Sequence, residues 1–409
     1  MKSFNVPLNY RSPLITAVKE YRKKGDKLKK DFTPTRLDLG PLQIYLARHF
    51  GFCYGVENAI EIAFRTLDEN PGKRIYLLSE MIHNPHVNKD LLDRGVQFLQ
   101  DTHGKQLIPF ELLTADDIVI IPAFGTTLEM EARLEAIGIK TEKYNTTCPF
   151  VERVWNRSEQ IATKGYTIII HGKPKHEETR ATFSHASENT PALILNDMKD
   201  AEALAGFIAG TTPFADFAER FKGNYSEGFD PSIHLNKIGV INQTTQLASD
   251  TQAISDFLKK AMEQRFGNDQ TALSDYFADT RDTLCYATMD NQTSVQGMLE
   301  VDTDLALVIG GYNSSNTTHL VELCELKRPT FFINSHKKMI SKNEIIHYNF
   351  HTKEEDTIQD FLPAKEPVKI SITSGASCPD AFVEDVIRKL ADFFGVSEKI
   401  DPLIESFTS

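Results

Sequence analysis

Short apolar runs that alternate with helical patterns are the feature that most constrains the fold of this chain. Each run has the length of a strand, ends in small or polar residues, and precedes a stretch of helical periodicity. Such runs are typical of strands that are buried on both faces. Their alternation with helices predicts parallel α/β layers. The predicted strands lie within 43–47, 74–79, 117–125, 166–172, 237–245, 305–311, 329–334 and 368–377.

The length of the chain predicts several domains. A chain of 409 residues exceeds what one simple core supports. A segment near 205–235, rich in Gly-Thr-Thr-Pro and Gly-Phe-Asp-Pro turns, is interpreted as an insertion packed against the second domain. The predicted parts are an N-terminal extension over 1–42, three α/β domains over 43–147, 148–283 and 284–396, and a C-terminal tail over 397–409.

Charge and hydropathy exclude two classes of partner. The net charge of −12 argues against nucleic-acid binding, which needs a basic surface. No apolar run approaches the roughly 20 residues of a membrane span. The N-terminus has neither an apolar signal core nor an Arg/Ser-rich transit composition. We therefore expect a cytoplasmic protein that binds neither nucleic acid nor membrane.

The cysteines suggest a metal centre that the fold must assemble. None of the five cysteines forms a CxxC pair, and disulfides are rare in a reducing compartment. Cys53, Cys148 and Cys285 stand at junctions between elements, where a helix N-terminus lowers the pKa of a thiol and favours the thiolate. By contrast, Cys324 falls on the apolar stripe of a helix and is expected in the core. Three unrelated buried thiols remain the alternative.

Three thiolates suit a [4Fe-4S] cluster that binds a substrate. Four protein ligands close such a cluster, whereas three leave one iron position open for a substrate oxygen. The sequence 171–179, His-Gly-Lys-Pro-Lys-His-Glu-Glu-Thr, adds histidines and carboxylates after a predicted strand, where acid–base chemistry is expected. His83 follows another strand. A solvated turn and a structural histidine are the competing interpretations.

Two further strand ends are rich in hydroxyl and amide groups. The segments 310–317 and 373–380 both open predicted helices, and helix N-termini with free N–H groups favour phosphate binding. Simple N-capping is the alternative. Two such loops, together with neutral donors and histidines elsewhere, point to a diphosphate.

Taken together, these motifs resemble the 4-hydroxy-3-methylbut-2-enyl diphosphate reductase family over about residues 44–395. The amino-acid sequences of these motifs are similar to those of the plant and cyanobacterial branch. The motifs are Pro-Ala-Phe-Gly at 122–125, His-Gly at 171–172, His-Glu-Glu-Thr at 176–179, Asn-Gln-Thr-Thr at 242–245 and Asn-Ser-Ser-Asn at 313–316.

The resemblance implies three α/β domains in a pseudo-threefold trefoil around one central [4Fe-4S] cluster per chain. Cys53, Cys148 and Cys285 would bind it and leave one open iron site. The implied activity is reductive dehydroxylation to isopentenyl and dimethylallyl diphosphates, the last step of the methylerythritol phosphate route, with ferredoxin or flavodoxin as electron donor. Glu178 would be the proton donor, and Thr244 would hold the substrate hydroxyl. The implied diphosphate ligands are His83, His176, Ser314, Ser315, Asn316 and Ser377.

Three departures from the family pattern concern the site. Phe124 stands where much of the bacterial branch has a diphosphate-binding histidine. Asn145 replaces an aspartate before Thr-Thr-Cys-Pro, and Asn291 replaces an arginine before Gln292. Since the last two are near cluster cysteines in the sequence, they are expected to change the local electrostatics of the cluster.

Two other kinds of protein stay open as interpretations. One is another three-cysteine iron–sulfur enzyme, either a dehydratase or a quinolinate-synthase-like enzyme, although the hydroxyl-rich loops suit a diphosphate better than a dicarboxylate. The other is a non-catalytic iron–sulfur redox sensor, which would have no need of a proton donor such as Glu178.

Overall fold

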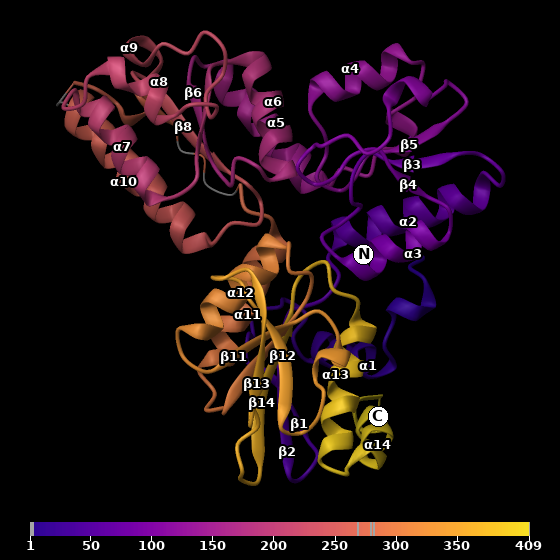
Figure 1. Ribbon diagram of the computed structural model, residues 1–409. Helices are drawn as coiled ribbons and strands as arrows, with labels where there is room; N and C mark the ends of the chain where they lie inside the picture. The colour runs from indigo at the N-terminus through magenta and orange to yellow at the C-terminus, as the bar shows by residue number, and fades with distance from the viewer. Residues whose placement is uncertain (1–3, 268–269, 279, 281–282, 409) are drawn as a thin grey trace. The chain divides into compact units, whose positions relative to one another are not determined.

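The computed structural model describes residues 4–267, 270–278, 280 and 283–408 (Figure 1). The chain divides into two compact units, and each is described by itself. The first unit holds the residues up to Glu61, then Ile82–Lys89, and those from Tyr286 onward; the second holds Ile62–Met81 and Asp90–Cys285. Two helices, α2 (Tyr54–Glu69) and α3 (Pro85–Asp93), contribute residues to both units.

The first unit is built on a five-stranded sheet. Its strand order is β1-β2-β14-β10-β11, and only the β1–β2 pair is antiparallel. The central strands β10 and β14 are almost wholly buried, as expected for strands covered on both faces. The strands are β1 (Thr35–Asp38), β2 (Leu42–Leu46), β10 (Leu305–Ile309), β11 (Thr330–Ile333) and β14 (Val368–Ser374).

Helices and a hairpin complete this unit. Leu14 and Ile15 of the first helix are fully buried in the same core as the sheet, so the N-terminal extension is part of this unit. Cys324 is also fully buried there, which confirms its predicted core position. The elements are α1 (Pro13–Gly25), α11 (Tyr286–Leu299), α12 (Ser315–Glu325), the hairpin β12 (Glu344–Asn349) and β13 (Glu354–Gln359), α13 (Asp380–Phe393) and α14 (Ile400–Thr408).

The second unit contains two parallel sheets. A three-stranded sheet has the order β4-β3-β5, and a four-stranded sheet has the order β7-β6-β8-β9. Every residue of β6 and β8 is buried. The strands are β3 (Ile75–Leu77), β4 (Gln97–Phe98), β5 (Ile118–Ile120), β6 (Thr167–His171), β7 (Ala192–Leu195), β8 (Ile238–Asn242) and β9 (Phe277–Ala278).

Helices pack on the sheets of the second unit. Phenylalanines from the segment near 205–235, including Phe217 and Phe221, share a core with Ile169 of β6 and Leu193 of β7. That segment therefore packs against the four-stranded sheet. The helices are α4 (Leu128–Ala136), α5 (Pro149–Ala162), α6 (Glu177–Asn189), α7 (Met198–Ala209), α8 (Phe217–Arg220), α9 (Pro231–His234) and α10 (Ala248–Phe266).

The α/β class predicted from the sequence is confirmed, and each predicted run overlaps a strand. The runs did not reveal β1, β4, β7, β9 or the β12–β13 hairpin. β1 and the hairpin strands are largely polar, and β4 and β9 are only two residues long; β7 is a buried apolar strand that was overlooked. The domain boundaries at 43, 148 and 284 stay predictions. Within the described residues, no helix is both long and apolar enough to cross a membrane.

Candidate functional site

The ends of β6 and β8 form the framework of a site in the second unit. The strands run parallel, with His171 beside Asn242. Immediately after β8, the Gln243 main-chain N–H donates to the His171 carbonyl over 2.8 Å. The Gln243 side-chain oxygen accepts a bond from the Thr179 hydroxyl over 3.0 Å. These bonds fix the two loops that follow the strands against each other.

Glu178 and Thr244 meet at this strand edge. Glu178 lies in the first turn of α6 and is 2% exposed. Its Oε1 accepts the Thr244 main-chain N–H over 2.5 Å. The preceding His176 caps the helix, and its Nδ1 accepts the Glu178 N–H over 3.2 Å. A buried carboxyl group therefore lies at a helix N-terminus, where the helix dipole favours negative charge.

Cys148 and Cys285 belong to the same edge. The Cys285 N–H donates to the Thr244 carbonyl over 3.3 Å, and the Cys148 N–H donates to the Ala123 carbonyl over 3.0 Å. Burial, with smaller contributions from the charges of Cys285 and Glu178, raises the pKa of the Cys148 thiol to about 12. The interaction with Cys285 indicates that the two thiols are neighbours.

The expected lowering of thiol pKa at a helix N-terminus is wrong for Cys148. The main-chain N–H groups of Phe150 and Val151 do lower this pKa, but burial outweighs them. A bound cation would supply the positive charge that such a buried thiolate needs, because a metal ion deprotonates a coordinating thiol. A pair of half-buried thiols, one of them with a raised pKa, therefore fits a metal cluster.

Asn145 shapes the turn that leads into Cys148. Its side-chain oxygen accepts the Thr147 N–H over 2.8 Å and the Thr147 hydroxyl over 2.6 Å. An aspartate would make the same two bonds with an added negative charge. The departure from the family pattern therefore keeps the turn and removes a charge near the cysteine.

Phe124 packs against His176 in the second unit. The two ring centroids lie 5.7 Å apart with an interplanar angle of 84°, an edge-to-face contact. Gly125 next to it has φ +75°, and a Cβ there would lie 2.5 Å from the Trp155 ring. The glycine is required at this close approach, and Phe124 is held where it supports the His176 ring.

In the first unit, Cys53 lies beside one of the two hydroxyl-rich loops. It directly precedes α2, and its N–H donates to the Ala376 carbonyl over 3.2 Å. The Ala376 N–H in turn donates to the Asn316 side-chain oxygen over 2.9 Å. The cysteine loop, the loop after β14 and the first turn of α12 are thus joined by consecutive hydrogen bonds.

His83 lies against both hydroxyl-rich loops. The Ser377 hydroxyl donates to the His83 carbonyl over 3.1 Å, and Asn84 Nδ2 donates to the Ser377 carbonyl over 2.8 Å. A Cβ at Gly311 would lie 2.2 Å from the His83 carbonyl oxygen, so only glycine fits there. The first unit therefore gathers His83 with the loops that hold Ser314 and Ser377.

The start of α12 carries a donor suited to a ligand. Ser314 caps the helix by accepting the Thr317 N–H over 3.3 Å, and Ser315 is buried beside it. Asn316 Nδ2 is buried and has no hydrogen-bond partner among the described residues. A buried amide left without a partner is costly, and a bound anion would satisfy it.

Asn291 contacts the same asparagine. Its Nδ2 lies 3.5 Å from the Asn316 side-chain oxygen. This contact connects the departure to a predicted substrate residue. Its expected effect on the electrostatics of the cluster stays a prediction.

The predicted site residues fall into two groups, one in each unit. The second unit brings together Cys148, His176, Glu178, Thr244 and Cys285; the first brings together Cys53, His83, Ser314, Ser315, Asn316 and Ser377. Among the described residues, no three His, Cys, Asp or Glu side chains form a ready-made metal site. Their roles as ligands and proton donor remain predictions.

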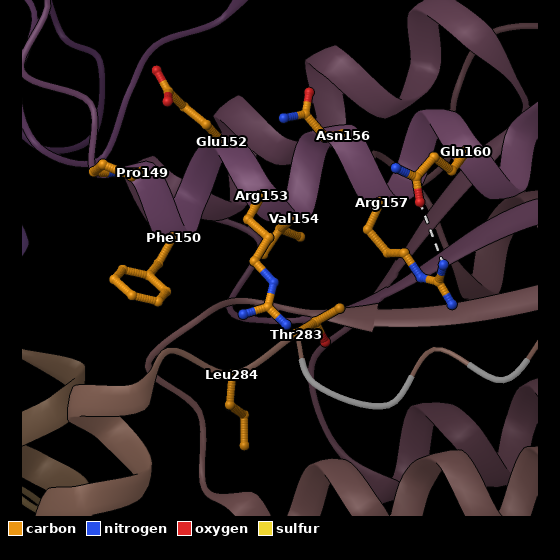
Figure 2. A pocket seen from close by; sticks show the side chains of 10 residues that line it. All are labelled: Pro149, Phe150, Glu152, Arg153, Val154, Asn156, Arg157, Gln160, Thr283 and Leu284. Carbon is orange, nitrogen blue, oxygen red and sulfur yellow. Dashed lines mark hydrogen bonds between the residues drawn. The ribbon is translucent and has the colours of Figure 1, made fainter.

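A cavity of about 450 Å³ in the second unit was not predicted from the sequence. It lies between α5 and the segment with Thr283 and Leu284, so it adjoins the residues next to both cysteines (Figure 2). Arg153 and Arg157 extend from α5 toward that segment, whereas Glu152 points away from it (Figure 2). Arg153 and Arg157, spaced about one helical turn apart, were a possible sequence signal for this cavity. Nothing in the sequence, however, placed the 283–284 segment opposite them.

Half-buried thiols, a buried carboxyl and hydroxyl-rich helix starts at the ends of parallel strands are typical of a metal-dependent α/β enzyme. The family described as LytB protein matches residues 44–391, and the chain belongs to this family. The family is one of iron–sulfur enzymes.

Curated relatives carry one name. The chain is 41% identical to a 4-hydroxy-3-methylbut-2-enyl diphosphate reductase of a Picosynechococcus species over 87% of this chain and 85% of the relative. A Cyanothece protein of the same name is 36% identical over 96% of this chain and 92% of that protein. The predicted resemblance to the cyanobacterial branch is confirmed.

Two solved structures share the fold. The E-1-hydroxy-2-methyl-but-2-enyl-4-diphosphate reductase from Plasmodium falciparum matches with a TM-score of 0.61 and 22% identity, over 85% of this chain and 87% of that chain. A structure titled (E)-4-hydroxy-3-methyl-but-2-enyl diphosphate reductase, the terminal enzyme of the non-mevalonate pathway, matches with a TM-score of 0.51 and 23% identity, over 85% and 99% of the two chains.

Replacing Asn145 tests its part in the turn before Cys148. Asn145→Ala removes both bonds to Thr147 and should lower the free energy of unfolding by about 1 kcal/mol in urea denaturation. Asn145→Asp keeps an acceptor at the same place and should stay within about 0.5 kcal/mol of the unmodified protein. Equal stability of the alanine variant would show that this side chain does not hold the turn.

Proposed function

We propose that this chain reduces (E)-4-hydroxy-3-methylbut-2-enyl diphosphate to isopentenyl and dimethylallyl diphosphates. The reaction takes up two electrons and two protons, breaks the C–O bond of the substrate hydroxyl, and releases water. The observation that carries the proposal is the bond between Glu178 Oε1 and the Thr244 N–H, because it places a buried carboxyl beside the backbone that holds Cys285. Membership of the LytB family and the names of the relatives support it.

We assign Cys53, Cys148 and Cys285 as the ligands of one [4Fe-4S] cluster with one iron free of protein ligands. When bound, this group supplies electrons and a Lewis-acid position for the substrate hydroxyl. The support is the chemistry of the donors: Cys148 and Cys285 are close enough to affect each other's charge, and Cys53 stands before a helix. In the part of the chain that the structure describes, Cys324 and Cys378 are fully buried in the apolar core.

Glu178 is the proposed proton donor, and Thr244 its positioning partner. Oε1 of Glu178 accepts the Thr244 N–H, which fixes the orientation of the carboxyl. The carboxyl is buried at a helix start. The Thr244 hydroxyl, on the residue that the carboxyl holds, is suited to bind the hydroxyl end of the substrate.

The diphosphate is proposed to bind at the starts of α12 and α13. The loops before these helices contain no lysine or arginine. Neutral donors must then converge on the anion, and Asn316 Nδ2 is buried with no partner in the described residues. Ser314, Ser315 and Ser377 supply hydroxyl groups, and His83 and His176 are the proposed imidazole ligands.

Ferredoxin or flavodoxin is the proposed electron donor, and the cytosol is the proposed compartment. Both carriers are acidic proteins, and a chain with a net charge of −12 can attract them only at a local basic surface. The wall of the cavity beside α5 offers Arg153 and Arg157, and it also includes Pro149 and Leu284, which directly adjoin Cys148 and Cys285 in the chain.

Turnover by anaerobically reconstituted protein tests the proposed activity. With the hydroxylated diphosphate and a small chemical reductant, we expect both isoprenoid diphosphates and no product from the monophosphate. Glu178→Gln keeps the shape of the side chain but carries no transferable proton. Its turnover should fall by at least about 10²-fold, the usual scale of general acid catalysis.

Glu188→Gln is the matched control for this variant. It makes the same change at the exposed far end of α6 and should leave turnover as it is. Undiminished turnover in Glu178→Gln would remove Glu178 from the mechanism. Absence of product with the unmodified, cluster-loaded protein would contradict the proposed function itself.

The electron-donor surface is tested by changing its charge. Arg153→Gln should raise the KM for reduced ferredoxin several-fold and weaken its dependence on salt, since surface charge steers association. Turnover with the small reductant should not change. Lys164→Gln, an equal change of charge just beyond the other end of α5, is the control. An unchanged KM in Arg153→Gln would place the docking surface elsewhere.

A further inference from the structure

The loop that carries Cys53 is contacted along its length by the N-terminal extension. The loop runs from Phe50 to the start of α2 at Tyr54. Each of its three aromatic residues contacts a residue from within 4–19. Lys19 Nζ lies 5.0 Å from the centroid of the Phe50 ring. Tyr10 contacts Phe52 with ring centroids 5.9 Å apart, and Phe4 contacts Tyr54 at 4.9 Å, both edge to face.

Lys19 also closes the space around Gly51. Its Nζ donates to both carboxylate oxygens of Asp380, over 2.8 and 2.9 Å. A Cβ at Gly51 would lie 2.3 Å from Asp380 Oδ1 and 3.1 Å from Lys19 Nζ. Gly51 has φ +78°, a conformation that glycine tolerates but that packing must hold. The ion pair therefore sits directly on the turn that sets the direction of the chain into Cys53.

Asp380 connects this contact to the proposed diphosphate loop. It is the first residue of α13 and follows Ser377 by three positions. The Cys53 N–H bonds to the Ala376 carbonyl in that same loop. Lys19 thus acts on the cysteine loop from one side and on the start of α13 from the other.

The extension is itself firmly attached to the first unit. Ser12 caps α1, and its hydroxyl donates to the buried Glu384 carboxylate on α13. The Leu14 N–H donates to the same carboxylate over 3.3 Å. Arg388 donates to its other oxygen over 2.7 Å. The start of α1 is therefore tied to α13 at a point separate from the Lys19–Asp380 contact.

We propose that residues 4–19 form a clamp that positions the Cys53 loop, with Lys19 as its principal positioning residue. The clamp holds the direction of the Cys53 side chain before any cluster is present. The importance of that direction for catalysis rests on the proposed function, but the clamp itself does not. Lys19 contacts the loop and not the reacting atoms, so its role is to position and not to catalyse.

The test measures the thiols of the metal-free protein one by one. The protein is treated with iodoacetamide at fixed pH, and the rate at each cysteine is followed by peptide mass spectrometry. In Lys19→Met the Cys53 rate should rise at least about threefold, because the loop opens locally more often. Cys148 and Cys285, in the second unit, should keep their rates, and fully buried Cys324 reports on loosening of the first unit as a whole.

Matched variants separate positioning from general destabilisation. Lys19→Arg keeps a cation that can reach Asp380 and should restore a slow Cys53 rate. Lys23→Met removes an exposed lysine from the same helix and should change nothing. Tyr10→Leu removes a second clamp contact and should also raise the Cys53 rate, which keeps the test available if Lys19→Met does not fold.

Two results would overturn the proposal. One is a Cys53 rate that stays unchanged in both Lys19→Met and Tyr10→Leu. The other is a parallel rise at Cys53 and Cys324, which would show that the extension only stabilises the unit. Because the assay uses neither cluster nor substrate, a failure here is separate from a failure of the proposed activity.

Discussion

The parallel pairing of β6 with β8 is the interaction on which the chemistry of the second unit depends. Parallel strands end at the same edge of a sheet, so the segments that follow them share one location. That geometry lets Glu178, after one strand, accept the amide of Thr244, after the other. The carbonyl of Thr244 then anchors Cys285. A shift in register would separate the acid from the backbone that holds the thiol.

Much of this arrangement could be predicted because it depends on local patterns. Buried parallel strands are continuous apolar runs, and polar residues after them are conspicuous, which is how the segment with Glu178 and the loop with Ser377 were identified. Thr244 was named only through the family resemblance. The contacts between those loops could not be predicted, since they join residues far apart in the chain. Asn291 illustrates this: it is close to Cys285 in sequence, yet its side chain contacts Asn316. Local reasoning also failed for the pKa of Cys148, because burial is a property of the whole fold.

In both units, neutral side chains stand at several positions of the proposed site. Near Cys148 the chain has Asn145 where the family pattern has a carboxylate, and Phe124 packs edge to face on His176 where others have a second histidine. The loops before α12 and α13 use neutral donors throughout. Lys19 is a charged side chain beside the Cys53 loop. Its ammonium group pairs with Asp380 and lies over the Phe50 ring, so its charge helps to hold that loop in place. The charge of Lys19 thus holds the framework of the Cys53 loop, and the loops proposed to bind the diphosphate offer neutral donors.

The central proposal is that Cys53, Cys148 and Cys285 hold one cluster. The most direct test is iron and sulfide per chain, with the absorption spectrum, after anaerobic reconstitution of single cysteine variants. The account predicts close to four irons per chain in the unmodified protein and in Cys324→Ser, as expected for a [4Fe-4S] cluster. It predicts loss of the chromophore and of bound iron in Cys53→Ser, Cys148→Ser and Cys285→Ser. A Cys53→Ser protein that retains the full cluster and its activity would contradict the account.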